Sequence, residues 1–125
     1  MRARVLLIDE HDEARTSLAQ RLRRNARLEL VGAVASVEEA ADLLTTGRPD
    51  IVLLDTHRHD GRGIEACREL KQRTGAPVVA LASFMTPQLW RAVHEAGALD
   101  YLLKHVDTEQ LSRSIVRLAD RCQHP

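Results

Sequence analysis

Three acidic residues and one lysine end short apolar runs of the chain, and together they could carry out metal-assisted phosphoryl chemistry. Asp9 and Glu10 follow one run, Asp55 ends a second, and Lys104 follows a third. Carboxylates brought close together repel one another and raise each other's pKa unless a cation lies among them. Mg²⁺ prefers hard oxygen ligands and is commonly shared with a phosphate, and a lysine can pair with a phosphoryl oxygen. These residue types could therefore form and stabilise an acyl phosphate on Asp55.

The acidic residues could instead be helix caps. Asp9, Glu10 and Asp55 each come shortly before a predicted helix, where acidic side chains satisfy free amide groups and oppose the helix dipole. A single acidic residue in this position is more often a cap than a ligand. We favour the functional interpretation because the whole group, with Lys104, is expected at the carboxyl ends of strands, and the capping interpretation remains its alternative.

The elements that must position these residues alternate between strand and helix. Apolar runs predict five strands, and apolar residues at helical spacing predict a helix after each one. The predicted strands cover residues 5–8, 28–34, 51–55, 78–82 and 99–103. Such alternation requires right-handed crossovers and a parallel sheet covered on both faces, so the predicted class is α/β. The mixed polarity of residues 28–34 favours an edge position for that strand.

The starts and ends of the predicted helices carry recognisable signals. Three helices begin with capping residues, namely Ser36 with Glu39, Thr86 with Pro87, and Asp107 with Gln110. Gly47 and Gly97 are expected to end the second and fourth helices.

Composition sets the limits of what the chain can be. The 125 residues are long enough for one domain with a real core, and we assign residues 1–125 to a single domain. Basic and acidic residues balance at 18 each, so no net field favours nucleic acid or an anionic membrane. Cys67 and Cys122 lack metal-ligand spacing, and no apolar segment has the length of a membrane span. A reduced, cytoplasmic setting fits best.

Several segments resemble the receiver domain of bacterial two-component response regulators, and the resemblance covers essentially the whole chain. The segments are VLLIDEH at 5–11, PDIVLLD at 49–55, DGRGIE at 60–65, SF at 83–84 and YLLK at 101–104. The last two look most like the NarL/FixJ subgroup of transcription regulators. No single motif is decisive, but five in the right order and spacing are very specific.

The resemblance implies a fold and a reaction. The fold is flavodoxin-like and doubly wound, with five βα units and the strand order 2-1-3-4-5. A histidine kinase would donate a phosphoryl group to Asp55, with Lys104 binding the phosphate. The implied ligands of Mg²⁺ are Asp9, Glu10, Asp55 and the backbone carbonyl of His57. The domain would catalyse only its own phosphorylation and dephosphorylation, and is not otherwise an enzyme.

The resemblance also implies a switch, at which this sequence departs from the family. Phosphorylation would shift a surface made by the fourth helix, fifth strand and fifth helix, with Tyr101 as the switch aromatic, for homodimerisation or effector control. Ala82 stands where the family has Ser or Thr, His59 where it usually has Pro, and His105 where Pro is frequent. The alternative is therefore a receiver-like interaction module whose output does not depend on phosphate.

Two further expectations concern partners and chemistry. NarL/FixJ relatives usually continue into a DNA-binding helix-turn-helix domain, and the residues after Leu118 provide none, so we expect no direct nucleic acid binding by this chain and no membrane contact. A small Mg²⁺-dependent phosphohydrolase is a third interpretation, which the absence of a cap insertion disfavours.

Four histidines and one tryptophan complete the candidate residues. His11, His57, His59 and His105 are all predicted on loops at the same end of the sheet. They are best explained as solvated loop residues, with a transition-metal or pH-sensitive site as the alternative. Trp90 lies on the predicted fourth helix, and an exposed Trp90 would indicate a dimerisation or docking surface.

Overall fold

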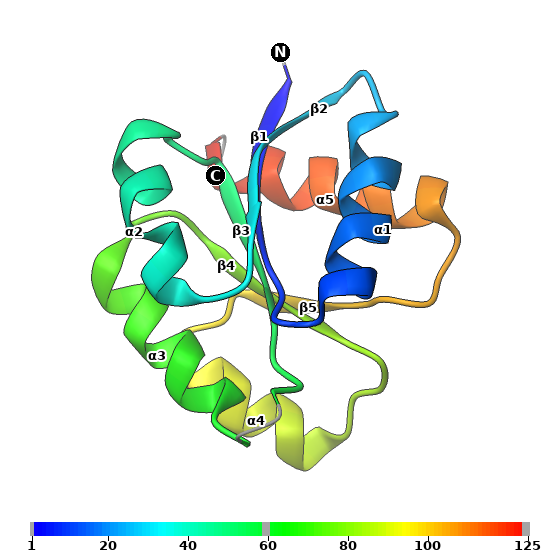
Figure 1. The fold of residues 1–125 in the computed structure, drawn as a ribbon. Coiled ribbons are helices and arrows are strands. Elements are labelled where there is room, and N and C mark those ends of the chain that lie inside the picture. Colours follow the sequence, from blue (N-terminus) through cyan, green and yellow to red (C-terminus); the bar gives the residue numbers. More distant parts are fainter. Residues whose placement is uncertain (1, 59–60, 124–125) are drawn as a thin grey trace.

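A five-stranded parallel sheet with helices on both faces forms the protein (Figure 1). The computed structural model describes residues 2–58 and 61–123. For residues 122 and 123 it describes the backbone alone. The strand order is β2-β1-β3-β4-β5, which confirms the predicted flavodoxin-like arrangement and the edge position of the second strand.

Strands and helices alternate along the whole described chain, as the sequence predicts. The strands are β1 Ala3–Ile8, β2 Leu28–Val34, β3 Ile51–Asp55, β4 Val78–Ala82 and β5 Asp100–Leu103. The helices are α1 Asp12–Arg23, α2 Val37–Thr46, α3 Gly63–Arg73, α4 Pro87–Glu95 and α5 Thr108–Gln123. β1 thus begins two residues before the predicted strand, and β5 begins one residue later than predicted.

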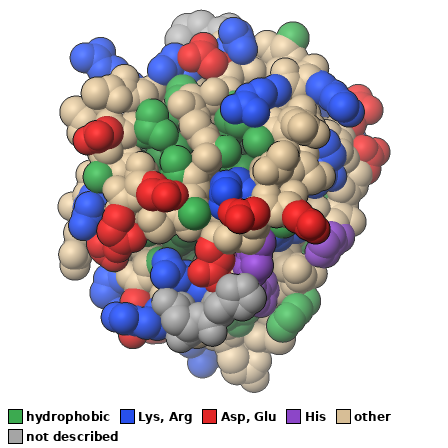
Figure 2. All heavy atoms as spheres, in the orientation of Figure 1, with side chains coloured by type: hydrophobic (Ala, Val, Ile, Leu, Met, Phe, Trp, Pro, Cys, Tyr) green, Lys and Arg blue, Asp and Glu red, His purple; other side chains and the backbone are tan. Residues whose placement is uncertain are grey.

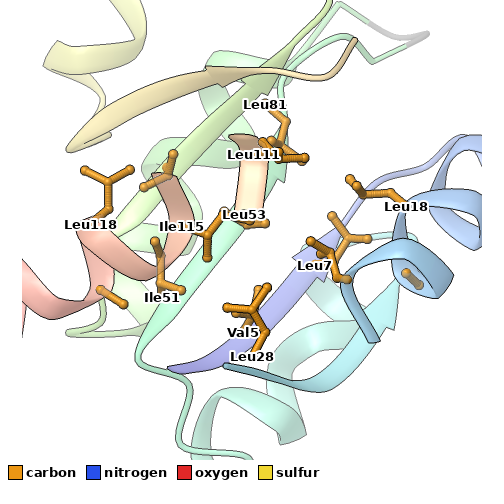
Figure 3. Packing of buried hydrophobic residues seen from close by; sticks show 14 residues of the cluster. Val5, Leu7, Leu18, Leu28, Ile51, Leu53, Leu81, Leu111, Ile115 and Leu118 are labelled. Carbon is orange, nitrogen blue, oxygen red and sulfur yellow. The ribbon is translucent and has the colours of Figure 1, made fainter. Parts of the chain in front are cut away.

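Side chains of the central strands alternate between two apolar cores. Val5, Leu7 and Leu53 lie in a core beneath α1 and α5, and Leu6 and Leu54 lie in a second core beneath α2, α3 and α4. Figure 3 shows the first core, to which α1, α5 and the strands contribute side chains. Each fully buried aliphatic side chain contributes about 1.5–3 kcal/mol through the hydrophobic effect. Burial on both faces explains why the β3 sequence is continuously apolar.

The predicted helix starts are confirmed, with one local difference. Thr86 Oγ1 accepts a hydrogen bond from the Leu89 amide at 3.1 Å, and Asp107 Oδ1 accepts one from the Glu109 amide at 2.9 Å. Ser36 Oγ accepts from the Glu39 amide at 3.1 Å, but the Glu39 carboxylate accepts from the amide of Ala35 at 2.7 Å. The return bond of this capping box therefore goes to the residue before the N-cap.

Charged side chains of both signs are mixed over the face seen in Figure 2, without a wide field of one sign. This agrees with the balanced composition. Cys67 is buried, and burial raises the pKa of its thiol. Within residues 2–58 and 61–123, no helix is long and apolar enough to cross a membrane.

Replacing Gly63 by alanine should destabilise the protein, because the added Cβ would lie 1.9 Å from the Thr56 carbonyl oxygen. The backbone between β3 and α3 would have to shift, and overpacking of this kind costs about 1–3 kcal/mol of unfolding free energy. Urea titration measures the loss. Gly75→Ala is the matched control, since nothing lies within 4 Å of a Cβ at that position. Equal losses in the two variants would contradict the packing argument.

Candidate functional site

Asp9 and Asp55 lie side by side where two neighbouring strands end. Ile8 pairs with Leu54 in the parallel register of β1 and β3, so the next residue of each strand is one of the two aspartates. Both side chains are almost completely buried, with 0% and 2% of their surface exposed. The sheet therefore places two carboxylates together at its carboxyl edge, where ligands of open α/β sheets bind.

Lys104 brings its ammonium group to both carboxylates. It follows β5, and its Nζ donates to Asp9 Oδ2 at 2.8 Å and also to Asp55 Oδ2. Its side chain is 11% exposed, so the group is close to solvent but largely covered. The predicted meeting of Asp9, Asp55 and Lys104 is thus present in the structure.

His11 also enters the site, through the loop between β1 and α1. Its backbone N–H donates to Asp9 Oδ1 at 3.0 Å, and its ring Nδ1 lies 2.8 Å from the same oxygen. The ring Nδ1 is 3.7 Å from Asp55 Oδ2. The sequence analysis placed His11 on a loop at this end of the sheet, with a transition-metal or pH-sensitive site as the alternative, and did not predict its contact with Asp9. The signal that could have found it is its position two residues after an aspartate, where backbone amides commonly bind the aspartate side chain.

His57 orients the other carboxylate. Its backbone N–H donates to Asp55 Oδ1 at 2.8 Å, which leaves Asp55 Oδ2 facing Lys104. The imidazole ring lies against Phe84, with ring centroids 5.1 Å apart, and its Nε2 is buried without a hydrogen-bond partner among the described residues. The loop after β3 is thereby linked to the loop after β4.

The other predicted residues lie around this group. Asp9, His11 and Asp55 offer ligand atoms that all lie within 4.8 Å of one another, and half-buried Glu10 is not in that group. Ala82 is completely buried, and its carbonyl oxygen accepts the backbone N–H of Lys104 at 2.9 Å.

Tyr101, the predicted switch aromatic, contacts a second aromatic ring, and the residue after Ala82 contacts the loop after β5. Tyr101 is half-buried against Trp90, which is itself only half-buried, with ring centroids 5.4 Å apart. Ser83 is exposed, and its Oγ lies 3.3 Å from His105 Nε2. The predictions about His59 lie outside the described residues.

The pKa values of Asp9 and Lys104 are shifted more by their hydrogen bonds than by their burial. Burial by itself raises the pKa of Asp9, but the hydrogen bonds from Lys104 and His11 bring that pKa below its ordinary value. Burial by itself lowers the pKa of Lys104, but its bonds to Asp55 and Asp9 raise that pKa above its ordinary value. Two carboxylates and one ammonium leave one negative charge in excess, and carboxylate oxygens suit a hard divalent cation. The donor set therefore fits a metal ion.

The sequence was compared with models of known protein families. The family model of the response regulator receiver domain matches residues 5–116. The chain belongs to the response regulator receiver domain family.

Curated and solved relatives agree with that assignment. The DNA-binding transcriptional activator DevR/DosR of Mycobacterium tuberculosis is 33% identical over 113 residues, which are 90% of this chain and 52% of the relative. A two-component response regulator of the LuxR family from a species of Aurantimonas superposes with a TM-score of 0.83 at 28% identity, covering 97% of this chain and 87% of the other.

The receiver domain described here spans about half the length of the curated relatives it matches. The LuxR-family relative is compatible with the expected NarL/FixJ subgroup. Receiver domains are generally signalling modules of two-component systems and not enzymes in the usual sense, and they typically bind Mg²⁺ at an acidic site. Asp9 and Asp55 form such an acidic cluster here.

Removing the ammonium group should expose the repulsion between the two carboxylates. We expect Lys104→Met to lower the unfolding free energy by roughly 3 kcal/mol at neutral pH without divalent metal, the lower end for breaking a buried pair. The lowered pKa of Asp9 means that its contribution is present above its ordinary pKa of 3.8 and is lost as pH falls through the folded value. The stability gap between wild type and variant should therefore narrow in acid.

The control for this prediction is the double variant Lys104→Met with Asp55→Asn, which removes one carboxylate charge along with the ammonium. It should recover part of the lost stability in urea titrations at neutral pH, because the repulsion between two carboxylates is gone while Asp9 still lacks its ammonium partner. A double variant as unstable as Lys104→Met alone would show that the loss comes from packing of the lysine stem and not from uncompensated charge.

Proposed function

We propose that Asp55 accepts a phosphoryl group from a histidine kinase in a Mg²⁺-dependent reaction. The observation that carries this proposal is the contact of Lys104 with Asp55 at the carboxyl edge of the sheet. Asp55 would attack phosphorus, forming an aspartyl phosphate bond while the bond to the kinase histidine breaks and its imidazole leaves. The receiver domain would contribute positioning and charge stabilisation, and the kinase would contribute the phosphoryl group.

Each residue of the site has a role in this proposal. The His57 amide holds one Asp55 oxygen, so that the carboxylate is oriented before a donor arrives. Lys104 lies where it could move from Asp55 to a phosphoryl oxygen while keeping its bond to Asp9. Asp9 and Asp55, with Glu10 and the His57 carbonyl, would hold Mg²⁺, which supplies neutralising charge to the phosphoryl oxygens when bound.

The proposed output is a change in the surface of α4, β5 and α5. Movement of Lys104 would pull on β5 and on the end of β4, because its backbone N–H is bonded to the Ala82 carbonyl. Trp90 and Tyr101 lie on α4 and β5 and contact one another, so they would report this movement. The expected binding partner at this surface is a second copy of the chain or an effector domain.

A receiver-like interaction module that works without phosphate is the second candidate. The observation that favours it is the buried methyl group of Ala82, which has no hydroxyl to bind an incoming phosphoryl group. In this case partner binding or dimerisation would be the same with and without phosphate, although Asp55 could still react.

Acetyl phosphate with Mg²⁺ should add one phosphoryl group to the wild-type protein, measured by intact mass. Asp55→Asn should abolish the addition because it removes the nucleophilic oxygen, and Lys104→Met should slow it strongly. Glu109→Gln, which changes an exposed residue near the start of α5, is the control and should react like wild type. An Asp55-independent addition, or none with any of several divalent metals, would refute the proposed reaction.

Installing the missing hydroxyl should strengthen the coupling from site to output. We expect beryllofluoride with Mg²⁺ to change the emission of Trp90, the only tryptophan, and to change it more in Ala82→Ser than in wild type. The measurement is fluorescence titration together with sedimentation of the free and liganded protein. Phosphorylation without any change in emission or self-association in either variant would favour the phosphate-independent module.

A further inference from the structure

The imidazole ring of His11 contacts a carboxylate oxygen that belongs to the candidate metal site. Its Nδ1 lies 2.8 Å from Asp9 Oδ1 and 3.7 Å from Asp55 Oδ2. These separations are close to those between neighbouring ligand atoms of a metal whose bonds are about 2.0–2.2 Å long. Two buried carboxylates and one imidazole thus offer ligand atoms that all lie within 4.8 Å of one another.

This donor set differs in kind from a purely oxygen site. Mg²⁺ favours hard oxygen ligands, whereas imidazole suits Zn²⁺, Co²⁺, Ni²⁺ and related ions, which bind nitrogen more strongly. We propose that His11 Nδ1 is a metal ligand beside Asp9 and Asp55, and that this receiver domain binds divalent transition-metal ions in preference to Mg²⁺. The inference deepens the proposed function, because it rests on the same metal site and changes its selectivity.

Lys104 and His11 contact different oxygens of Asp9. Lys104 is bonded to the Oδ2 atoms of both aspartates, whereas His11 faces Asp9 Oδ1. A metal between Asp9 Oδ1 and His11 Nδ1 would replace the proton that they share, and Lys104 could keep its bond to Asp9.

The backbone holds His11 in the position that the proposal needs. The His11 amide is bonded to the same Asp9 oxygen at 3.0 Å, and Arg15 Nη1 donates to the Asp9 carbonyl at 2.8 Å. His11 is also the N-cap of α1, with φ −83° and ψ 106°. Because these hydrogen bonds fix the loop, the imidazole needs no large rearrangement to act as a ligand. Such preorganisation lowers the free-energy cost of binding a metal ion.

Cobalt binding by the whole protein tests the inference without any phosphoryl donor. Co²⁺ should give visible ligand-field absorption typical of a site with a nitrogen ligand, and it should bind far more tightly than Mg²⁺ in competition. His11→Ala should weaken Co²⁺ binding by at least about tenfold, the scale expected for losing a group in a metal's coordination environment. The same substitution should change Mg²⁺ affinity much less, because oxygen ligands remain.

His105→Ala is the matched control, since His105 is an exposed histidine on the loop after β5 and contacts Ser83 instead of the aspartates. It should leave Co²⁺ affinity unchanged. Nitrogen NMR of the wild-type imidazoles with Zn²⁺ provides a measurement that needs no variant, and the His11 Nδ1 signal should shift on binding. Unchanged Co²⁺ affinity in His11→Ala, equal losses for Co²⁺ and Mg²⁺, or an unshifted His11 signal would overturn the proposal.

Phosphorylation assays separate this inference from the proposed function. If Asp55 is phosphorylated with Mg²⁺ while Co²⁺ binds independently of His11, the transition-metal inference fails and the receiver reaction stands. If Co²⁺ binds through His11 but no metal supports phosphorylation of Asp55, the inference stands and the proposed reaction fails.

Discussion

The sharing of one ammonium group by two buried carboxylates is the interaction on which the arrangement of this site depends. Lys104 is separated by 95 residues from Asp9 and by 49 from Asp55, yet its Nζ contacts both. Burying either aspartate alone would carry a large desolvation cost, and the lysine offsets it by charge and by hydrogen bonding. The ends of β1, β3 and β5 must therefore keep their relative positions for the charges to balance. Register errors in the sheet would unbalance them.

The sheet makes this charge cluster possible because its central strands are apolar on both faces. Side chains from Val5 to Ile8 in β1 and from Ile51 to Leu54 in β3 alternate between the two cores, so polar groups have no place along these segments. The next polar positions come at the carboxyl ends of the strands, and parallel strands end at the same edge. The gathering of Asp9, Asp55 and Lys104 thus follows from strand direction and register, before any detail of loop structure.

That physical order explains which features could be predicted from the sequence. Strand positions follow from apolar runs and are confirmed by the structure. The gathering of charged residues at the strand ends follows from parallel strands, and the structure brings Asp9, Asp55 and Lys104 together but not Glu10. The strand order came from family resemblance, because periodicity carries no information on neighbours. The entry of His11 depends on the path of one short loop and on two hydrogen bonds to a single oxygen. Loop geometry of this kind is not encoded in hydrophobic pattern, and neither is the contact between Ser83 and His105.

The contacts around Ala82 bear on how a receiver domain without the switch hydroxyl could still transmit a signal. A hydroxyl at this position would attract the phosphoryl group directly. Here the bond from the Lys104 amide to the Ala82 carbonyl joins the end of β4 to the loop after β5, and the contact between Ser83 and His105 joins the loops after the two strands. A force on Lys104 therefore acts on the end of β4 as well as on its own loop. Loss of the hydroxyl removes the attraction of one loop to the phosphate, but it leaves the mechanical link through the lysine intact.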